Sequence, residues 1–142
     1  GGTRMPANYM LEIITPEREF FHGEVESVII PTPDGQMSIQ RMHEPMVAAL
    51  SIGEMKLCIQ GEWSVCTTSE GFVEVRPDET IIFSQAVEWP SEIDMKRAEE
   101  AKERAEERMR QQQSRQEYMR SQISLARAMV RLRVGKKNQN LD

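Results

Sequence analysis

The sequence predicts a β + α fold, in which an N-terminal antiparallel β-sandwich or flattened barrel is followed by a C-terminal α-helical hairpin. Composition changes sharply near Pro90. Residues 1–90 hold 5 basic and 14 acidic residues, a net charge of −9, whereas residues 91–142 hold 13 and 9, a net charge of +4. All prolines and every glycine except Gly135 lie in the first part. The expected parts are a leader or an expression remnant at residues 1–8, a sandwich at 9–88 and a two-helix hairpin at 89–142.

Short β-rich runs alternate with turn residues in the first part, which is typical of an all-β domain. In Val73-Glu74-Val75 the alternation places one face in a core and the other in water. Such short strands cannot bury an apolar face alone, so we expect two packed sheets. The predicted strands are Tyr9–Ile14, Phe20–Ile30, Lys56–Gln60, Ser64–Thr68, Phe72–Val75 and Thr80–Ala86.

The two cysteines, Cys58 and Cys66, lie in adjacent predicted strands on either side of a turn at Gln60-Gly61. A two-residue turn puts them out of direct register, so a disulfide would need a longer loop. We expect two buried free thiols.

The second part lacks proline and carries helical spacing. Ser91 is the predicted N-cap of the first helix, which runs to about Gln113. Small residues recur along one face of this helix and permit close approach of a partner helix. They are Ala98, Ala101 and Ala105, followed by Met109. A second helix is expected to end at Val134, with Gly135 as its C-terminal stop.

The second helix carries two apolar stripes on roughly opposite sides. They consist of Tyr118, Leu125, Met129 and Leu132, and of Ile123, Val130 and Val134. Between Arg115 and Lys137 there are seven basic residues and one acidic residue, Glu117. This pattern fits a helix that exchanges packing partners, one of them acidic, although an ordinary solvated hairpin would also produce it.

Motifs for chemistry are absent from the sequence. His22 and His43 have no partner in a nucleophilic motif, and there is no phosphate-binding Gly-rich loop, zinc signature or nucleic-acid motif. The apolar runs are too short to span a bilayer, and no signal peptide is evident. We therefore expect a non-enzyme without metal, obligatory cofactor, nucleic-acid partner or direct membrane insertion.

A set of motifs in order along the chain resembles the epsilon subunit of bacterial F-type ATP synthases. The combination, from about residue 9 to 134, is specific. The motifs are Ile14-Thr15-Pro16-Glu17-Arg18, Gly23-Glu24-Val25-Glu26, the Pro31 to Gly35 segment, Ser69 to Val75, Ile93-Asp94, Arg97-Ala98, Ala126-Arg127-Ala128 and Arg131-Leu132.

One segment departs from the family pattern. Where the family usually has a Gly-Ile-Leu-Pro-Gly-His-Ala-Pro-like loop, this chain reads Ser38-Ile39-Gln40-Arg41-Met42-His43-Glu44-Pro45. His43 and Pro45 are kept, but the Gly and Pro positions are not. In the family this edge helps to face the rotor, so the departure indicates an altered contact or a different partner.

The resemblance implies a non-catalytic central-stalk subunit that couples rotation to catalysis. It implies contacts with the gamma subunit, the c-ring and the catalytic alpha and beta subunits, at the cytoplasmic face of the cell membrane. The hairpin would lie folded or extend along gamma and restrain ATP hydrolysis. Arg115, Arg120 and Arg133 are the predicted contacts to the beta subunit.

The resemblance also implies a regulatory ATP site in the folded hairpin. The family motif of Ile or Leu, Asp, two variable residues, Arg and Ala is found at Ile93 to Ala98. Adenine would be surrounded by Glu88, Ile93, Asp94 and Ala98, and the phosphates would meet Arg97, Arg104, Arg127 and Arg131. Guanidinium groups bind phosphate through charge-assisted hydrogen bonds.

Two alternatives remain from the sequence. One is a free-standing interaction adaptor that reuses the fold, and the other is a small-ligand sensor whose hairpin closes on a nucleotide. Co-purification with gamma separates the adaptor from the stalk subunit.

Overall fold

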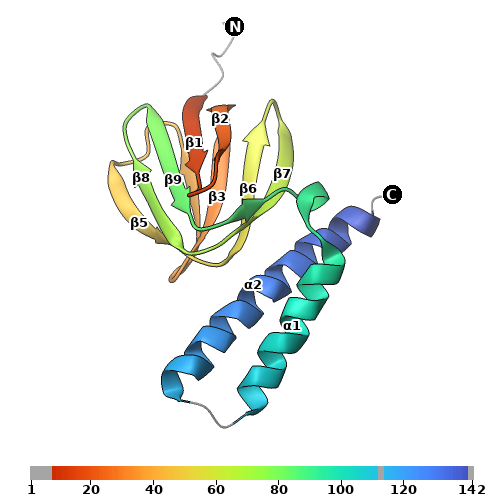
Figure 1. Ribbon diagram of the computed structural model, residues 1–142. Coiled ribbons are helices and arrows are strands. Elements are labelled where there is room, and N and C mark those ends of the chain that lie inside the picture. The colour runs from red at the N-terminus through yellow and green to blue at the C-terminus, as the bar shows by residue number, and fades with distance from the viewer. Residues whose placement is uncertain (1–7, 112–113, 141–142) are drawn as a thin grey trace, which may run out of the picture. The chain divides into compact units, whose positions relative to one another are not determined.

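The computed structural model describes residues 8–111 and 114–140, and it divides between Val87 and Glu88 into two compact units. The first unit is a β-sandwich and the second is a hairpin of two long helices, as Figure 1 shows. The predicted fold class, a β-sandwich followed by a helical hairpin, is confirmed.

The described residues form ten strands in two five-stranded sheets. The first sheet has the order β2-β1-β9-β8-β5 and the second β10-β7-β6-β3-β4. Strands β1 and β9 pair in parallel, and the pairs β1–β2, β3–β4, β3–β6, β5–β8, β6–β7 and β8–β9 are antiparallel. The strands are β1 Tyr9–Ile14, β2 Glu19–Val25, β3 Ser27–Thr32, β4 Gly35–Gln40, β5 Met46–Leu50, β6 Gly53–Ile59, β7 Glu62–Thr68, β8 Gly71–Val75, β9 Glu79–Ser84 and β10 Val87–Glu88.

Alternating side chains from both sheets fill the core of the sandwich. In β8, Val73 and Val75 are buried while Glu74 between them is half-buried, as the alternation predicts. The side chains with no exposed surface include Leu11, Ile13, Val28, Ile30, Ile39, Met55, Leu57 and Ile82.

The predicted strand Phe20–Ile30 is wrong as a single element, because β2 ends at Val25 and β3 begins at Ser27. Glu26 lies between them, and its carboxylate accepts a hydrogen bond of 2.8 Å from the Gly61 amide. Strands β4 and β5 were not predicted. Their sequences, Gly-Gln-Met-Ser-Ile-Gln in β4 and Met-Val-Ala-Ala-Leu in β5, contain few β-branched and no aromatic residues, so their β-signals are weak.

The prediction of buried free thiols is confirmed, since Cys58 and Cys66 are both buried and unbridged. Across the β6–β7 hairpin Cys58 pairs with Trp63, whereas Cys66 pairs with Met55. The turn has positive φ at both central residues, 51° at Gln60 and 79° at Gly61, which matches the twist of the flanking strands. Burial raises the pKa of the Cys66 thiol well above its ordinary value.

The divergent segment begins inside β4, where Ile39 is fully buried and anchors the strand in the core. Met42 follows with a left-handed φ of 69° and a side chain that is 78% exposed. This is the position at which the family pattern has its second glycine. The chain therefore keeps a backbone shape that favours glycine, although a bulky apolar residue occupies it.

The second unit contains a short 3₁₀ turn, Pro90–Glu92, and two helices, α1 Met95–Arg110 and α2 Arg115–Asn140. The predicted cap at Ser91 is wrong. Ser91 lies inside the 3₁₀ turn, and Asp94 caps α1 by accepting a 3.1 Å hydrogen bond from the Arg97 amide. The carboxylate thus satisfies an N–H group that has no partner within the helix.

Gly135 was predicted to end the second helix, and that prediction is wrong, because α2 continues through it to Asn140. A Cβ atom on Gly135 would overlap Sδ of Met95 and lie 3.4 Å from Cγ2 of Ile93. Gly135 is therefore a close-approach glycine, where the start of α1 meets the last third of α2.

Small buried residues recur on both helices. The first helix contributes Ala98 and Ala105, as the predicted stripe required, whereas Ala101 and Met109 are half-buried. The second contributes three small residues at intervals of seven, which place them on one side of α2. We call this line of contact the seam; it consists of Ala98, Ala105, Ser121, Ala128 and Gly135.

Candidate anion site on the helical hairpin

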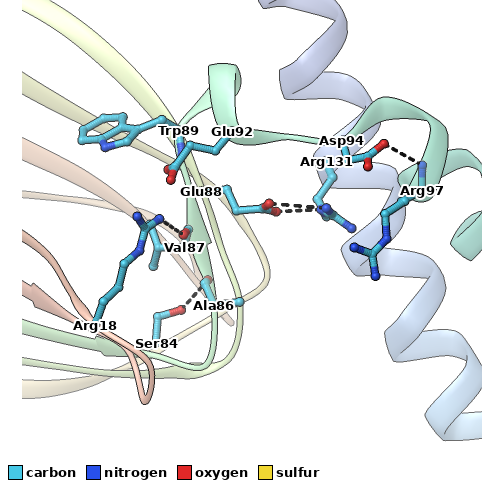
Figure 2. Close-up of polar contacts among 10 residues, drawn as sticks. All are labelled: Arg18, Ser84, Ala86, Val87, Glu88, Trp89, Glu92, Asp94, Arg97 and Arg131. Carbon is cyan, nitrogen blue, oxygen red and sulfur yellow. Dashed lines mark hydrogen bonds and ion pairs between the residues drawn. The ribbon is translucent and has the colours of Figure 1, made fainter.

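The segment that leads into α1, residues 88–94, is held in a fixed shape by its own hydrogen bonds. The Trp89 amide donates to Oε1 of Glu92 at 2.9 Å, and the Ile93 amide donates to the Pro90 carbonyl at 3.3 Å. Ile93 is buried. This connecting segment therefore presents its polar groups, Glu88 and Asp94, from a defined backbone (Figure 2).

Glu88 and Arg131 form a bidentate ion pair within the second unit. Nε of Arg131 lies 2.7 Å from Oε1 of Glu88, and Nη2 lies 3.3 Å from Oε2. Their side chains are only 25% and 28% exposed. Figure 2 shows the carboxylate facing the guanidinium edge-on. Nε and Nη2 of Arg131, which the family resemblance predicts to bind phosphate, thus donate hydrogen bonds to a carboxylate.

The other residues of the predicted adenine contact are used in the local structure. Asp94 caps α1 with one carboxylate oxygen, as described above, and remains exposed. Ile93 and Ala98 are both buried. Their contact with adenine stays a prediction.

The predicted phosphate-binding arginines fall into two levels along the hairpin. Gly135 faces Met95, and the helices run antiparallel, so each residue after Met95 on α1 lies at the level of one residue earlier than Gly135 on α2. Arg97 is then within about 3 Å, along the axis, of the level of Arg131, and Arg104 within about 1.5 Å of the level of Arg127. The two levels are roughly 6–10 Å apart.

These four side chains also leave the hairpin on one face. Successive residues rotate by about 100°, so Arg97 and Arg104 share a flank of α1, as Arg127 and Arg131 share a flank of α2. Seen along each helix from its N-terminus to its C-terminus, the arginine flank is reached from the seam by turning in the same direction. Because the two helices run antiparallel, equal turns bring both flanks to the same face of the hairpin. The fold therefore brings the four arginines together across the seam.

Beyond the pairs Arg97–Arg131 and Arg104–Arg127, a third pair of arginines lies nearer the loop between the two helices. This pair was not recognised from the sequence. Arg108 and Arg120 line a hollow of about 330 Å³. Its other lining residues are Gln111, Glu117 and Ser121. Arg108 follows Arg104 by four residues, and this spacing was the available signal. The arginine face is defined as Arg97, Arg104, Arg108, Arg120, Arg127 and Arg131.

Charge on the outer side of α1 opposes anion binding. A hollow of about 480 Å³ there is lined by Arg104 and Arg110 together with four glutamates, Glu100, Glu103, Glu106 and Glu107. Arg104 lies at the border between this acidic surface and the arginine face. An anion is therefore attracted to the side of Arg104 that faces α2.

The three residues predicted to contact the beta subunit do not form one patch. Helical geometry places Arg115 and Arg133 on the flank opposite Arg120. On that flank Tyr118 and Met129 are exposed, at 40% and 44%. The second helix thus presents an apolar-basic surface, Arg115, Tyr118, Met129 and Arg133, separate from the arginine face.

The sandwich has a partly exposed apolar row of its own. Strand register aligns Ala49, Phe72, Phe83 and Ile14 across β5, β8, β9 and β1. The rings of Phe72 and Phe83 stack with centroids 4.6 Å apart, and Phe72 is 46% exposed. A hollow of about 310 Å³ adjoins them. This surface suits a protein partner more than a polar ligand.

Within residues 8–111 and 114–140, no group of three or more His, Cys, Asp or Glu side chains has the arrangement of a metal site. Neither helix of the described part carries an apolar stretch that could cross a membrane.

Both units match known family models. Residues 8–90 match the model described as the ATP synthase delta/epsilon chain, beta-sandwich domain, and residues 91–136 match its long alpha-helix domain. A sandwich with a helical hairpin in this order is thus the architecture of a class of ATP synthase subunits.

Bacterial relatives identify the member of that class. The ATP synthase epsilon chain of Ruminiclostridium cellulolyticum is 46% identical over 126 residues, which cover 89% of this chain and 94% of the relative. That of Caldanaerobacter subterraneus subsp. tengcongensis is 42% identical over 138 residues, covering 96% of this chain and 100% of the relative. The chain therefore belongs to the family of bacterial ATP synthase epsilon chains, and the resemblance noted in the sequence is confirmed.

Solved structures share the fold at low identity. A chain in the Euglena gracilis mitochondrial ATP synthase structure, described as OSCP/F1/c-ring, has a TM-score of 0.76 at 22% identity and covers 91% of this chain and 82% of its own length. A chain in the central stalk/c-ring structure of the Tetrahymena thermophila mitochondrial ATP synthase has a TM-score of 0.67 at 11% identity, with coverages of 89% and 95%.

Proposed function

We propose that this chain is a non-catalytic central-stalk subunit that couples rotation to catalysis in the ATP synthase and regulates ATP hydrolysis through its hairpin. The family match along residues 8–136 carries this proposal. The proposed location is the cytoplasmic face of the cell membrane, as a peripheral part of the complex.

The sandwich is proposed to dock on gamma and the c-ring. Support comes from the row Ala49, Phe72, Phe83 and Ile14, which leaves apolar area in water that a protein partner would cover. Met42 is a further exposed apolar side chain, at the loop where the family faces the rotor.

A pull-down with gamma from the same organism tests this docking. Wild-type chain should retain gamma, and the variant Phe72→Glu should lose it, because a carboxylate would be buried without a partner. The matched control Glu74→Gln, on the same outer face of β8, should bind like wild type. A chain that binds no gamma would instead be the adaptor that reuses the fold.

The hairpin is proposed to restrain ATP hydrolysis by contact with the catalytic alpha and beta subunits. The apolar-basic surface of α2 supports this role, since it pairs exposed Tyr118 and Met129 with Arg115 and Arg133. In the reconstituted complex, Arg115→Ala/Arg133→Ala should relieve inhibition, and more so at low salt, where charges are least screened. Arg120→Ala should relieve less, because Arg120 lies on the other flank. Equal ATP hydrolysis by complexes with the wild-type chain, Arg115→Ala/Arg133→Ala and Arg120→Ala would contradict the proposed contact.

The arginine face is proposed to bind ATP as a regulatory ligand. Two arginines from each helix reach one face at adjoining levels, and an anion between them would neutralise like charges drawn from both helices. ATP would then favour the folded hairpin by its differential affinity for the two forms.

Calorimetric titration of the isolated chain tests this proposal. Wild type should bind ATP, and Arg97→Ala/Arg127→Ala should bind at least about tenfold more weakly, since each charged hydrogen bond contributes about 1.5–3 kcal/mol. The control Arg110→Ala, on the acidic outer side of α1, should bind like wild type. The proposed site would be contradicted if wild type gave no heat at millimolar ATP. It would also be contradicted if wild type, Arg97→Ala/Arg127→Ala and Arg110→Ala bound ATP equally well.

A further inference from the structure

Met42 combines a backbone conformation that favours glycine with an apolar side chain that lies in water. Its φ is 69°, and its side chain is 78% exposed, the highest value among the large apolar residues of the described part of the chain. The left-handed conformation costs free energy for a residue with a Cβ atom, and an apolar side chain left in water does not offset that cost. The Met42 side chain therefore contributes little to the stability of the free chain.

A tight turn fixes the backbone at Met42. The His43 amide donates a 3.1 Å hydrogen bond to the Gln40 carbonyl, which closes a turn in which Met42 is the third residue. A positive φ at the third position is typical of a type II turn, where glycine is the usual residue. The strand before the turn is anchored by Ile39, which is fully buried. Because the backbone is already ordered, burial of the Met42 side chain against a partner would cost little main-chain entropy.

Gln60 is the other non-glycine residue with a positive φ, at 51°, in residues 8–111 and 114–140. The two-residue turn between β6 and β7 requires that conformation, and the exposed side chain of Gln60 is polar. Met42 differs because its exposed side chain is apolar. A backbone outlier whose side chain has no stabilising contact within the chain indicates a function outside it.

The exposed apolar surface of the sandwich extends along β5 toward this turn. Val47, the second residue of β5, is 70% exposed and shares the outer face with Ala49, because side chains alternate along a strand. Ala49 belongs to the row with Phe72 that is proposed to dock on gamma. Met42 lies at most about 17 Å from Val47 along the chain. A protein that buries a typical patch of roughly 800 Å² on the sandwich, about 30 Å across, would therefore reach Met42 as well.

We propose that Met42 is an anchor residue that sets the affinity of the sandwich for gamma, and that gamma supplies an apolar recess for its side chain. This inference rests on the docking of the sandwich on gamma proposed above. In the complex the side chain leaves water, and this gain outweighs the backbone cost that the free chain carries. Glycine at this position would give a free chain that is at least as stable and a complex that is weaker.

The affinity of the full chain for gamma from the same organism tests the anchor, by calorimetric titration. Met42→Gln keeps the length of the side chain and the Cβ atom but replaces the thioether with an amide. It should bind gamma about tenfold more weakly than wild type, as expected when one apolar side chain is lost from a buried contact. Met42→Leu, which stays apolar, should bind within about threefold of wild type.

Met42→Gly separates a lost contact from lost folding. It should bind gamma as weakly as Met42→Gln, although its urea unfolding should show a free chain at least as stable as wild type. The matched control is Gln60→Gly, which relieves a positive φ at another exposed turn of the same sandwich without removing an apolar side chain. It should bind gamma like wild type.

The possible outcomes distinguish this inference from the proposed function. Wild-type affinity in Met42→Gln or in Met42→Gly would overturn the anchor, while loss of gamma by Phe72→Glu in the same experiment would retain the docking. Equal weakening in Gln60→Gly would also overturn the anchor, because the effect would then follow the turn backbone and not the side chain. A wild-type chain that binds no gamma would overturn the docking and the anchor together.

Discussion

The two units of this chain are stabilised by different amounts of apolar burial. In the sandwich, large side chains from both sheets, such as Leu57 and Ile82, have no exposed surface. In the hairpin, the seam consists of alanine, serine and glycine, which bury little area for each residue, and the larger buried side chains are fewer, namely Ile93, Val130, Leu132 and Val134. Since stability follows buried apolar area, the sandwich is expected to be the rigid partner-binding part and the hairpin the part that opens.

Removing a large core side chain should have the largest effect. Leu57→Ala should lower the free energy of unfolding of the sandwich by about 2–5 kcal/mol, because it leaves a cavity between the sheets. Urea unfolding followed by circular dichroism measures it. The neighbouring exposed control Lys56→Ala should change stability by less than about 0.5 kcal/mol. A small loss in Leu57→Ala would mean that the sandwich is not the tightly packed part.

Filling the close approach at Gly135 should have the next largest effect, confined to the hairpin. Gly135→Leu overpacks the contact with Met95 and Ile93, at a cost of about 1–3 kcal/mol. Better helix propensity offsets roughly 0.8–1 kcal/mol of that cost. Amide exchange in α2 should therefore accelerate, and the sandwich should be unaffected.

The matched control for this change is Lys136→Leu, which introduces the same side chain at the next, exposed position. It should leave exchange in α2 near the wild-type rate. If both variants behaved alike, the seam would not depend on the small size of residue 135.

Loss of the helix cap should be smaller. Asp94→Ala removes the acceptor of the Arg97 amide and should destabilise α1 by about 0.5–2 kcal/mol. Ser91→Ala is the control, because Ser91 lies in the 3₁₀ turn and does not cap α1. Helical circular dichroism during thermal melting compares the two. A larger loss in Ser91→Ala would restore the cap predicted from the sequence.

The smallest effect is expected at the divergent loop. Met42→Gly should stabilise the sandwich by up to about 1 kcal/mol, because glycine adopts the φ of 69° without steric cost. Arg41→Gly, the neighbouring substitution, should give no such gain. A loss of stability in Met42→Gly would indicate that the Met42 side chain packs on the sandwich, despite its exposure.

The sequence predicted the elements whose signals are local and strong. Alternation located Val73 and Val75 in the core, and the turn at Gln60-Gly61 set the register that keeps the cysteines apart. Strands β4 and β5 were missed because their burial depends on pairing with β3 and β8, which no local pattern reveals. Gly135 was misread as a stop, since a glycine needed for helix contact and a C-cap glycine look alike in sequence.

The candidate site was predicted only in part for similar reasons. Helical spacing alone grouped Arg97 with Arg104 and Arg127 with Arg131. Their common face required the antiparallel alignment of Gly135 with Met95, and the third pair, Arg108 and Arg120, required it as well. The ion pair of Glu88 with Arg131 joins distant parts of the chain, so it could be found only in the structure.

Hydrogen exchange of the full chain with and without ATP tests the central contrast most directly. We expect slow exchange in the sandwich strands under both conditions, and faster exchange in α1 and α2 that slows when ATP is added. It would be contradicted by helices that exchange as slowly as the sandwich without nucleotide, or by ATP that leaves exchange in both helices unchanged.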